Sequence, residues 1–402
     1  MLATRPSERI PLSGRSLPAA SVLRVLHVYS GNLFGGVERI LTAYAAHSGT
    51  ERCEIEFALC FDGRLRETLR DVGAVQHDLG PVRARYPWSR SRARARLREV
   101  LEAQRFDAVV IHSAWSQAMF ASVVREQNVP LAFYLHDVAN GTHWLERWAS
   151  RHQPDLVITN SQFTARSTEK LYPGARTAAL YAPVDVRPRV VGAGERSAMR
   201  ASLDTRDDDV VVVQVSRMQA WKGHALLLDA LARLRAGAGR SATRPWKLWI
   251  VGGPQRDEER LYVGALRAHA TDLGIEDSVR FLGERRDVPE LLAAADVFCQ
   301  PNAAPEPFGI VFIEALAAGL PVIATRMGGA MEIVDDSCGV LVVPTAVALA
   351  GALGNLIEDD VLRRTLGAGG PVRAQALCNP QRQWKELVQV LRALPGHPAT
   401  LR

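Results

Sequence analysis

The chain has 402 residues, of which 47% are hydrophobic and 23% charged, and its formal net charge at pH 7 is +6. This length excludes a single ordinary core and favours two domains of roughly 150 to 200 residues. The apolar runs are too short for a membrane-spanning helix.

The first 20 residues contain Pro, Ser and Arg but no apolar segment typical of a secretory signal, so we expect a flexible tail. The five cysteines are scattered among apolar neighbours, and none forms a Cys-x-x-Cys pair. This pattern predicts buried free thiols in a reducing compartment and no zinc site. The cysteines are Cys53, Cys60, Cys299, Cys338 and Cys378.

Short β-branched runs alternate with amphipathic stretches through the first half of the chain. Ser161 is expected to be the N-cap of a helix. Ile40, Leu41, Tyr44 and Ala45 share one face of an earlier helix. We predict strands at residues 21–29, 53–60, 106–113, 129–137 and 154–161, with helices at 35–48 and 115–127.

The second half repeats the alternation of strands and helices. We predict strands at residues 207–217, 246–253, 277–284 and 321–325, and a short helix and a strand within 288–302. Helices are predicted at 221–235, 257–273, 309–318 and 380–394, and further helices should end at about residue 366. Alternating helices and near-continuously apolar strands indicate parallel sheets covered on both faces. The fold class is therefore α/β, with two doubly wound parallel-sheet domains.

The domain boundaries follow from composition. A Gly-, Arg- and Asp-rich stretch separates the two series of strands, as expected of an exposed linker. We predict a tail at residues 1–20, a first domain at 21–186, a linker at 187–207, a second domain at 208–378, and a C-terminal helix at 379–395 that crosses back to the first domain.

Polar groups and glycines follow the predicted strands, where parallel sheets bind ligands. Gly35 and Gly36 follow the first strand, and His136 ends a later one. In the second domain, Arg217 and Lys222 follow one strand and Glu306 follows another. We expect these groups to converge on one crevice.

The residue types in this set suit a nucleotide attached to a sugar. Glycine turns and helix N-termini present backbone N–H groups to phosphate. Arg217 and Lys222 add full positive charge for a diphosphate. Gly36 could reach the same diphosphate from the first domain.

The stretch Pro-Glu-Pro-Phe-Gly-Ile at residues 305–310 begins the predicted helix at 309–318. The N–H groups of Phe308, Gly309 and Ile310 are available there for ligand oxygens. Glu306 stands before the helix and could accept hydrogen bonds from sugar hydroxyls. Glu314, inside the helix, could accept two ribose hydroxyls, which explains a carboxylate in a mostly apolar stretch.

Motifs of competing enzyme classes are missing. The sequence has no Gly-x-x-x-x-Gly-Lys-Ser/Thr loop, no Gly-x-Gly-x-x-Gly after a predicted strand, and no Gly-x-Ser-x-Gly. The chain resembles instead the retaining glycosyltransferases of family 4, which have the GT-B fold of two Rossmann-like domains facing a cleft. The resemblance extends from about residue 22 to 384. It rests on FGGVER, LHD, VSRMQAWKG, VGG, FLGERRDVPELLAAADVFCQPN, PEPFGIVFIEALAAGLPVIAT and GGAMEIV.

The resemblance implies a role for each matching residue. Glu306 and His136 would lie at the donor sugar as catalytic groups, and Glu314 would hold the ribose. Arg217 and Lys222 would neutralise the leaving diphosphate, assisted by the loop of Gly35 and Gly36. The first domain would handle the acceptor and the second the nucleotide sugar. The family transfers sugar with retention and needs neither a metal nor another cofactor.

Simpler interpretations stay open for several of these residues. Glu306 alone could cap a helix, and a lone histidine such as His136 is more often structural than catalytic. Arg217 and Lys222 could be surface charges, although their place after a strand favours a functional role. Glu332 is expected to be a first-turn acid of a helix.

Seven arginines lie between Arg83 and Arg98, next to Tyr86 and Trp88. A solvated helix face is the default for such a run. Basic segments flanked by aromatic residues also bind anionic membranes, at roughly 1 kcal/mol per Arg near the surface. A phosphorylated, lipid-linked acceptor is an equal alternative. The residues assigned to this surface are Arg90, Arg92, Arg94 and Arg96.

The sequence therefore predicts a cytoplasmic enzyme, peripheral on the inner face of the membrane, that builds a surface polysaccharide or glycolipid. Its partners would be a nucleotide-sugar donor and a glycan or lipid-linked acceptor. One alternative is a sugar-nucleotide epimerase or hydrolase on the same fold. Another is a non-catalytic basic binding module, but the sequence lacks a recognisable nucleic-acid motif, so no nucleic acid partner is expected.

Overall fold

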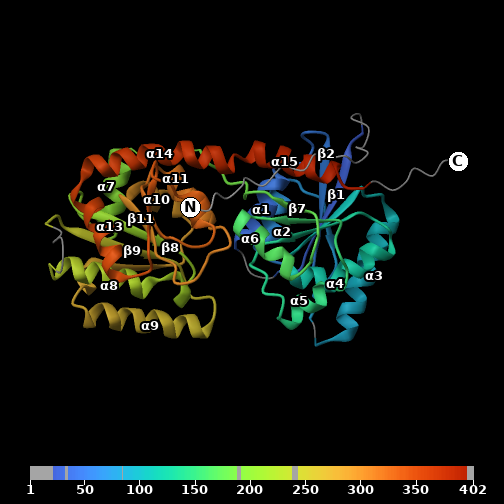
Figure 1. Cartoon of the computed structure of the whole chain (residues 1–402), viewed down its shortest axis with the longest axis horizontal. Helices are drawn as coiled ribbons and strands as arrows, with labels where there is room; N and C mark the ends of the chain where they lie inside the picture. The colour runs from blue at the N-terminus through green and yellow to red at the C-terminus, as the bar shows by residue number, and fades with distance from the viewer. Residues whose placement is uncertain (1–20, 32–34, 84, 188–191, 238–242, 396–402) are drawn as a thin grey trace, which may run out of the picture. The chain divides into compact units, whose positions relative to one another are not determined.

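The structure is a computed structural model that describes residues 21–31, 35–83, 85–187, 192–237 and 243–395. The chain divides into two compact units, each with its own sheet (Figure 1). Unit 1 consists of Met1–Thr159, Ala165–Leu180 and Gln383–Arg402, and unit 2 consists of Asn160–Thr164 and Tyr181–Arg382.

Unit 1 contains a parallel sheet of seven strands in the order β3-β2-β1-β4-β5-β6-β7. The chain reverses its direction of travel across the sheet between β1 and β4, which are neighbours. The strands are β1 (Leu23–Tyr29), β2 (Cys53–Leu59), β3 (Gln76–Asp78), β4 (Ala108–His112), β5 (Leu131–Leu135), β6 (Leu156–Thr159) and β7 (Thr177–Ala179).

Helices cover both faces of this sheet, α1 and α2 on one face and α3, α4 and α5 on the other (Figure 1). The last helix also packs on unit 1, where the buried ring of Trp384 lies 6.1 Å from that of Tyr44. The helices are α1 (Gly36–Ala45), α2 (Arg64–Asp71), α3 (Pro87–Ala103), α4 (Ser113–Glu126) and α5 (Trp144–Ala149), with the 3-10 turn η1 (Thr168–Lys170). Two further helices, α6 (Gln162–Ser167) and α15 (Pro380–Arg392), are divided between the units, since residues 162–164 and 380–382 belong to unit 2.

Unit 2 has a parallel sheet of six strands in the order β10-β9-β8-β11-β12-β13, with the reversal between β8 and β11. The strands are β8 (Val210–Val215), β9 (Trp246–Val251), β10 (Val279–Gly283), β11 (Val297–Gln300), β12 (Val322–Thr325) and β13 (Gly339–Val342). The helices are α7 (Ala193–Ser202), α8 (His224–Arg235), α9 (Asp257–Asp272), α10 (Val288–Ala294), α11 (Ile310–Ala317), α12 (Ala330–Ile333), α13 (Ala346–Glu358) and α14 (Asp360–Cys378), with 3-10 turns η2 (Ala220–Lys222) and η3 (Glu276–Ser278).

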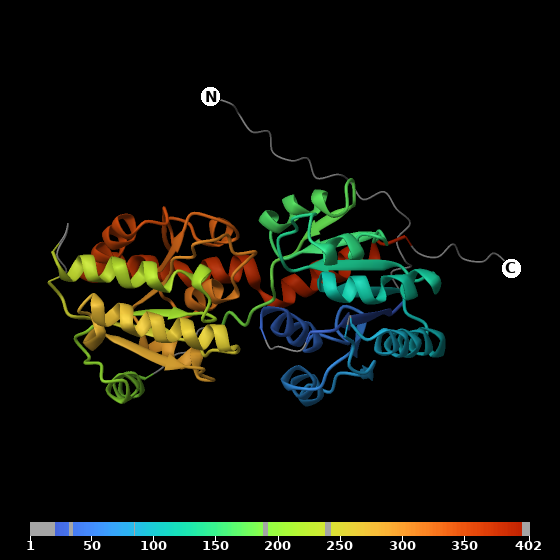
Figure 2. The ribbon, with the colours of Figure 1, turned by 90° about the horizontal axis from the view of Figure 1, so that it is seen from below.

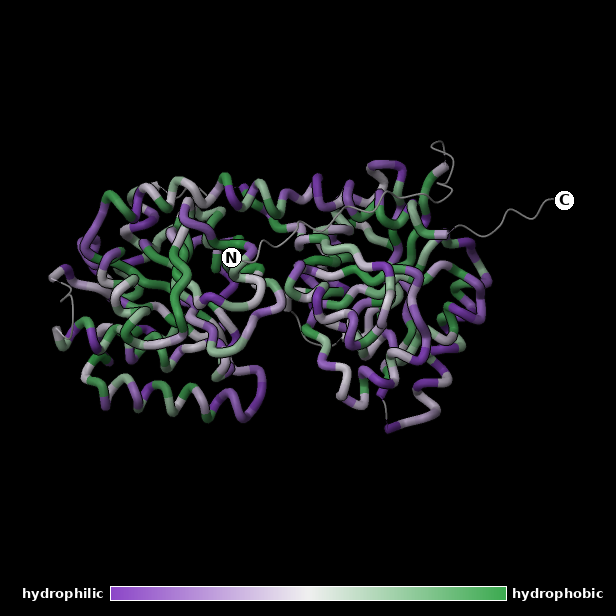
Figure 3. Tube along the Cα trace, in the orientation of Figure 1, coloured by the Kyte–Doolittle hydropathy of each residue, from purple (hydrophilic) through white to green (hydrophobic). Residues whose placement is uncertain are grey.

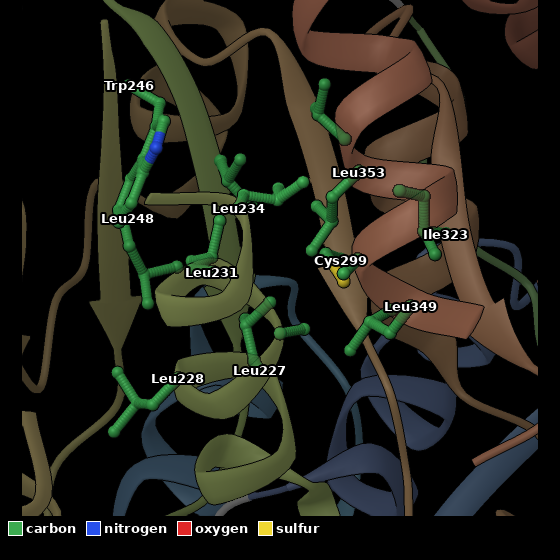
Figure 4. Close-up of a cluster of buried hydrophobic side chains, with 14 of the residues drawn as sticks. Leu227, Leu228, Leu231, Leu234, Trp246, Leu248, Cys299, Ile323, Leu349 and Leu353 are labelled. Atoms are coloured by element: carbon green, nitrogen blue, oxygen red, sulfur yellow. The ribbon is translucent and has the colours of Figure 1, made fainter. Parts of the chain in front are cut away.

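Apolar side chains between the sheet and the helices form the core of each unit. Hydrophobic residues gather along the central strands in both units (Figure 3). In unit 2, α8 and α9 lie side by side on one face of the sheet (Figure 2). Leu227 and Leu231 of α8 contribute to a buried cluster with Leu353 of α13 (Figure 4). All five cysteines are free and buried, as predicted.

The two predicted doubly wound sheets are confirmed, together with nearly every predicted strand and helix. Ser161 accepts a hydrogen bond from the N–H of Thr164 at 3.0 Å, which confirms it as an N-cap. The prediction that the helices end near residue 366 is wrong, because α14 continues to Cys378. A Cβ on Gly367 would lie 2.4 Å from the carbonyl oxygen of Gly319, so glycine permits close packing there.

Residues 187–207 were interpreted as an exposed linker; most of the described residues in this segment are exposed, but the segment belongs to unit 2 and is not a linker. Residues 188–191 lie outside the described residues, but α7 forms a helix within unit 2. Its Arg200 is 1% exposed and donates to Asp296 Oδ2 at 2.6 Å and to the carbonyl oxygen of Ala294 at 2.9 Å. A buried guanidinium with acceptors from several segments fixes α7 to the unit. Composition alone could not reveal these partners.

Arg200→Met should destabilise the protein by about 3 to 5 kcal/mol, because it leaves buried acceptors unpaired. Arg196 is the matched control, since it also donates to Asp296, at 2.7 Å, with a side chain that is 33% exposed. Arg196→Met should cost about 1 kcal/mol or less. Urea unfolding measures both values, and equal costs would contradict a structural role for the buried arginine.

Candidate functional site

The loops after β8 and β11 flank the point where the strand order of unit 2 reverses, which is where such sheets bind ligands. Arg217 and Lys222 follow β8. Asn302 and Glu306 follow β11. The structure thus brings together Lys222 and Glu306, two of the predicted donor-site residues, across the switch point.

Lys222 and Glu306 form a largely buried ion pair. Lys222 Nζ lies 2.5 Å from Glu306 Oε2, and the two side chains are 11% and 13% exposed. The same oxygen accepts from Asn302 Nδ2 at 2.9 Å and Gln300 Nε2 at 3.4 Å. Burial lowers the pKa of Lys222, and the charge of Glu306 opposes this effect. These donors explain how the carboxylate of Glu306 persists in a mostly apolar stretch.

The loop that carries Glu306 is fixed by close backbone packing. Gly328 has φ of +62°, and a Cβ there would lie 2.4 Å from the carbonyl oxygen of Glu306. Phe308 is buried, and its ring stacks on that of Tyr181 at 5.4 Å. Gly309 is the N-cap of α11, and the first N–H groups of this helix have no acceptor within it. The predicted N–H donors of Phe308, Gly309 and Ile310 therefore stand beside the ion pair.

Arg217 pairs with Glu259, a residue that sequence reasoning missed. Arg217 Nη2 lies 3.2 Å from Glu259 Oε1, and Glu259 Oε2 accepts from the N–H of Gln255 at 2.6 Å. Burial would raise the pKa of Glu259, but the hydrogen bond from Gln255 and the charge of Arg217 outweigh it and lower the pKa. A carboxylate in the first turn of α9 was the available signal.

The other acids of unit 2 have different surroundings. Glu314 is half-buried on α11 between the buried residues Ile313 and Ala315. Glu332 lies in the first turn of α12, as expected. It accepts from the N–H groups of Gln162 and Phe163 at 2.9 and 2.6 Å, so it also caps α6.

Gly35 and Gly36 lie in unit 1, at the start of α1. Residues 32–34 of the same loop lie outside the described residues. The N–H of Gly35 donates to Glu38 Oε2 at 2.7 Å, and the Tyr29 hydroxyl donates to the other oxygen of Glu38. Burial raises the pKa of Glu38. The predicted phosphate donor at Gly35 is thus engaged with a carboxylate in this structure.

A hollow of about 570 Å³ lies beside the switch point of unit 1. Ser113, which follows β4, has φ of +71°, a conformation that non-glycine residues seldom adopt outside functional or strained sites. The lining of the hollow combines apolar groups with two arginines. The lining residues are Tyr29, Ser30, Gly31, Phe61, Val82, Arg83, Arg85, Ser113 and Trp115.

His136 follows β5 and belongs to a row of three buried histidines in unit 1. His27 Nδ1 lies 2.8 Å from His112 Nε2, and His112 Nδ1 lies 3.0 Å from His136 Nε2. Burial lowers the pKa of His27 to about 3 and that of His136 to about 3. Burial, with the neighbouring rings, lowers the pKa of His112 well below its usual value. The three rings are therefore neutral at pH 7. Sequence reasoning missed His27 and His112.

The four arginines predicted to share one surface do not do so. Arg94 Nε donates to the carbonyl oxygen of Met119 at 2.6 Å, whereas Arg96 pairs with Asp78 at 3.2 Å. Arg92 is exposed. The reason is geometric, because residues two apart on a helix point in nearly opposite directions.

Arg90 and Arg94 instead join residues of α5 and the turn after it around a hollow of about 580 Å³. Arg90 lies over the ring of Trp148 at 5.7 Å, and Trp144 is 52% exposed. The spacing W-x-x-R-W-x-x-R at 144–151 was the available signal, since residues three and four apart on a helix are neighbours. In the structure α5 ends at Ala149, and Arg151 lies in the turn after it. We call this set the Arg-Trp patch: Arg90, Arg94, Trp144, Arg147, Trp148 and Arg151.

Two kinds of feature were not found among the described residues. No group of three or more His, Cys, Asp or Glu side chains is arranged to hold a metal ion in that part of the chain. No helix within the described ranges is long and apolar enough to cross a membrane.

The buried histidines predict a pH dependence of stability. Between pH 6.5 and 5 the unfolded chain binds protons on them and the folded chain does not, so the free energy of unfolding falls as pH is lowered. Each histidine contributes up to about 1.4 kcal/mol per pH unit. His27→Phe should make the slope shallower by up to that amount, measured by urea unfolding at several pH values.

Phe57→Leu is the matched control for this measurement. The ring of Phe57 lies 5.6 Å from that of His27 in the same core, so the substitution weakens packing without removing a histidine. Its stability should be lower at every pH, with the wild-type slope. A wild-type slope in His27→Phe would contradict the exclusion of protons from the folded row.

Two family models match consecutive parts of the chain. The model described as Glycosyltransferase Family 4 matches residues 34–187, and Glycosyl transferases group 1 matches residues 195–373. The D-inositol 3-phosphate glycosyltransferase of Stackebrandtia nassauensis is 34% identical over 54% of this chain and 49% of its own length. The matched region thus spans about half of that curated relative.

Two other relatives are similar to this chain. The GDP-mannose-dependent monoacylated alpha-(1-6)-phosphatidylinositol monomannoside mannosyltransferase of Corynebacterium glutamicum is 31% identical over 60% of this chain and 63% of its own. Anabaena HepE, solved in complex with UDP and glucose, superposes with a TM-score of 0.80 and 26% identity over 92% of this chain and 100% of its own. With its two parallel-sheet units and these matches, the chain belongs to glycosyltransferase family 4 and has the GT-B fold.

Proposed function

We propose that this chain is a retaining glycosyltransferase that moves a sugar from a nucleoside-diphosphate sugar to a glycan or lipid-linked acceptor. The observation that carries the proposal is the Lys222–Glu306 ion pair at the switch point of unit 2, beside the N-terminus of α11. We further infer a role in the synthesis of a surface polysaccharide or glycolipid.

The donor half of the reaction is assigned to unit 2. Arg217 and Lys222 stabilise the charge that develops on the departing diphosphate. The N–H groups at the start of α11 stabilise the same negative charge through the helix dipole. Glu314 accepts the ribose hydroxyls, and Glu306 contacts the donor sugar. Because Lys222 Nζ lies 2.5 Å from Glu306, one contact fixes the sugar-binding group relative to the phosphate-binding group.

The proposed transfer is a front-face displacement without a metal. The bond from the anomeric carbon to the diphosphate oxygen breaks as the bond to the acceptor oxygen forms on the same face. The acceptor proton passes to the departing phosphate oxygen. His136 and the loop of Gly35 and Gly36 contribute from unit 1, and no enzyme nucleophile is required.

Two of the relatives support a nucleotide-sugar donor. One relative is named for GDP-mannose and another was solved with UDP. The base and the sugar of the donor are therefore left to experiment.

Calorimetric titration with UDP, GDP, ADP, CDP and dTDP in EDTA tests the donor site. We expect one nucleoside diphosphate to bind the wild-type chain. Glu314→Ala should weaken it by roughly tenfold to a hundredfold, as expected when hydrogen bonds to a charged group are lost. Binding that appears only with added divalent metal would contradict the metal-independent site.

Glu276→Ala is the control, because Glu276 is exposed in η3 and outside the proposed site. It should bind the nucleotide as the wild type does. The bound nucleotide then identifies the donor sugars to assay. Breakdown of such a donor without any acceptor dependence would favour a hydrolase or epimerase, and no binding of any nucleotide would overturn the proposal.

We also propose that the Arg-Trp patch of unit 1 holds an anionic membrane surface that carries the acceptor. Trp144 offers an exposed apolar ring, and Arg147 and Arg151 are exposed cations that line the same hollow. Tryptophan at the interface and arginine near lipid phosphates are the usual elements of such binding.

Sedimentation with liposomes containing anionic lipid tests this surface. The wild type should be retained at low salt, and Arg147→Ser with Arg151→Ser should lower the affinity at least tenfold, since each Arg contributes roughly 1 kcal/mol. Arg260→Ser with Arg364→Ser changes the net charge equally at side chains 71% and 72% exposed in unit 2. Equal losses from both pairs would indicate a net-charge effect and contradict a defined patch.

A further inference from the structure

Residues 160–164 lie between β6 and the rest of α6 in the sequence, yet they belong to unit 2. Ser161 and Thr164 in this segment are fully buried. Ser161 Oγ lies 2.5 Å from the carbonyl oxygen of Pro307, and Thr164 Oγ1 lies 3.3 Å from the same oxygen. Two hydroxyl groups of the segment therefore meet one carbonyl group in the loop that carries Glu306.

The hydroxyl group of Ser161 makes two different hydrogen bonds. It has a single proton to donate. Its oxygen lies 2.5 Å from the Pro307 carbonyl oxygen but 3.0 Å from Thr164 Oγ1, so the shorter contact assigns the proton to Pro307. The same oxygen accepts from the N–H of Thr164 at 3.0 Å. Ser161 thus caps α6 as an acceptor and holds the Pro307 carbonyl as a donor.

Two successive carbonyl groups fix the loop around Glu306. The N–H of Gly329 donates to the carbonyl oxygen of Glu306 at 2.8 Å. A Cβ on Gly329 would lie 2.6 Å from Phe308 Cα and 2.8 Å from the Pro307 carbonyl oxygen, so this close approach requires glycine. Pro305 and Pro307 have no N–H group to donate. The loop is therefore held through its carbonyls, by backbone at one peptide group and by two hydroxyl groups at the next.

Glu332 anchors the segment that supplies these hydroxyl groups. Its carboxylate accepts from the N–H groups of Gln162 and Phe163, and the Tyr181 hydroxyl donates to it at 3.0 Å. Burial and the charge of Glu332 raise the pKa of Tyr181, so this hydroxyl keeps its proton at neutral pH. The ring of Tyr181 stacks on that of Phe308. The segment and the loop are thus tied to the same part of unit 2.

We infer that Ser161 is a positioning residue for the donor sugar, which acts through the Pro307 carbonyl on the neighbouring Glu306, with Thr164 as a weaker second donor. Lys222 holds the carboxylate of Glu306. The hydroxyl groups hold the backbone beside it, and the two contacts together fix the carboxylate relative to the start of α11. This inference rests on the proposed function, in which Glu306 contacts the sugar, and goes beyond the N-cap role of Ser161.

Hydrogen–deuterium exchange of the full chain tests the contact without any substrate. The N–H of Gly329 is the probe, because it donates to the carbonyl oxygen of Glu306. Mass spectrometry of peptides that cover residues 326–334 measures its exchange. In Ser161→Ala this amide should exchange about tenfold faster, the equivalent of one lost hydrogen bond. Faster exchange confined to residues 162–168, where the cap is lost, would overturn the positioning role.

Kinetics connect the contact to the reaction. The assay uses the nucleotide sugar whose nucleoside diphosphate binds the chain. Ser161→Ala should lower kcat about tenfold, again the equivalent of one hydrogen bond. The affinity for free nucleoside diphosphate should stay within about threefold of wild type, because the proposed ribose contact at Glu314 lies outside the loop. An unchanged kcat, or a tenfold loss of nucleotide affinity, would overturn the inference.

A conservative variant and a variant of the neighbouring hydroxyl separate positioning from capping. Ser161→Thr keeps a hydroxyl group at this position and should restore the exchange of Gly329 and kcat towards wild type. Thr164→Val removes the weaker donor but keeps the backbone N–H that Ser161 caps, so it should speed the same exchange by a smaller factor. No change at Gly329 in Thr164→Val, with Ser161→Ala unable to fold, would overturn the inference.

Thr345→Ala is the control for a general loss of stability. Thr345 is the N-cap of α13 in the same unit, and its side chain accepts from the N–H of Ala348 at 3.3 Å. The variant should be less stable in urea, with wild-type kcat and wild-type exchange at Gly329. An equal fall of kcat in Thr345→Ala and Ser161→Ala would overturn the positioning role. A wild type that binds no nucleoside diphosphate, with the expected exchange in Ser161→Ala, would overturn the proposed function and support the contact alone.

Discussion

The pairing of Lys222 with Glu306 is the interaction on which the arrangement of unit 2 depends. An ammonium and a carboxylate that are largely shielded from water each need a partner, and here the partner comes from the other side of the switch point. The pair connects the end of η2 to the loop before α11. Because the backbone of Gly328 packs on Glu306 as well, neither loop can move without breaking a buried contact.

The buried polar groups of unit 1 also need partners, but most of them are neutral. The sheet of this unit buries three histidines, from His27 inside β1 to His136 after β5, and the row of neutral rings satisfies most of its hydrogen-bonding groups internally. The Tyr29–Glu38 contact is a further case, in which burial raises the pKa of the carboxyl group. The polar groups near the two sheet edges therefore differ in kind. Those in unit 2 form ion pairs suited to a charged ligand, and those in unit 1 are largely neutral.

Local sequence patterns were enough to predict the architecture, because strand and helix periodicity and turn residues are local properties. Local patterns gave the wrong prediction where a contact between residues far apart in the sequence determines the structure of a segment. The segment with α7 has the composition of a linker, yet Arg200 finds two of its acceptors, on Ala294 and Asp296, more than 90 residues away. The site residues were predicted from their places after strands and from family resemblance. Their partners Glu259, His27 and His112 depend on which strands are neighbours, and one sequence does not reveal that order.

The paired cations also constrain how a diphosphate could bind. Lys222 and Arg217 each form an ion pair with a carboxylate, Lys222 with Glu306 and Arg217 with Glu259. Under the proposed function, the incoming negative charges must share these cations rather than meet free ones. The N–H groups at the start of α11 carry no such opposing charge. Much of the net attraction should therefore come from the backbone, with Lys222 and Arg217 gaining importance as charge builds on the leaving group.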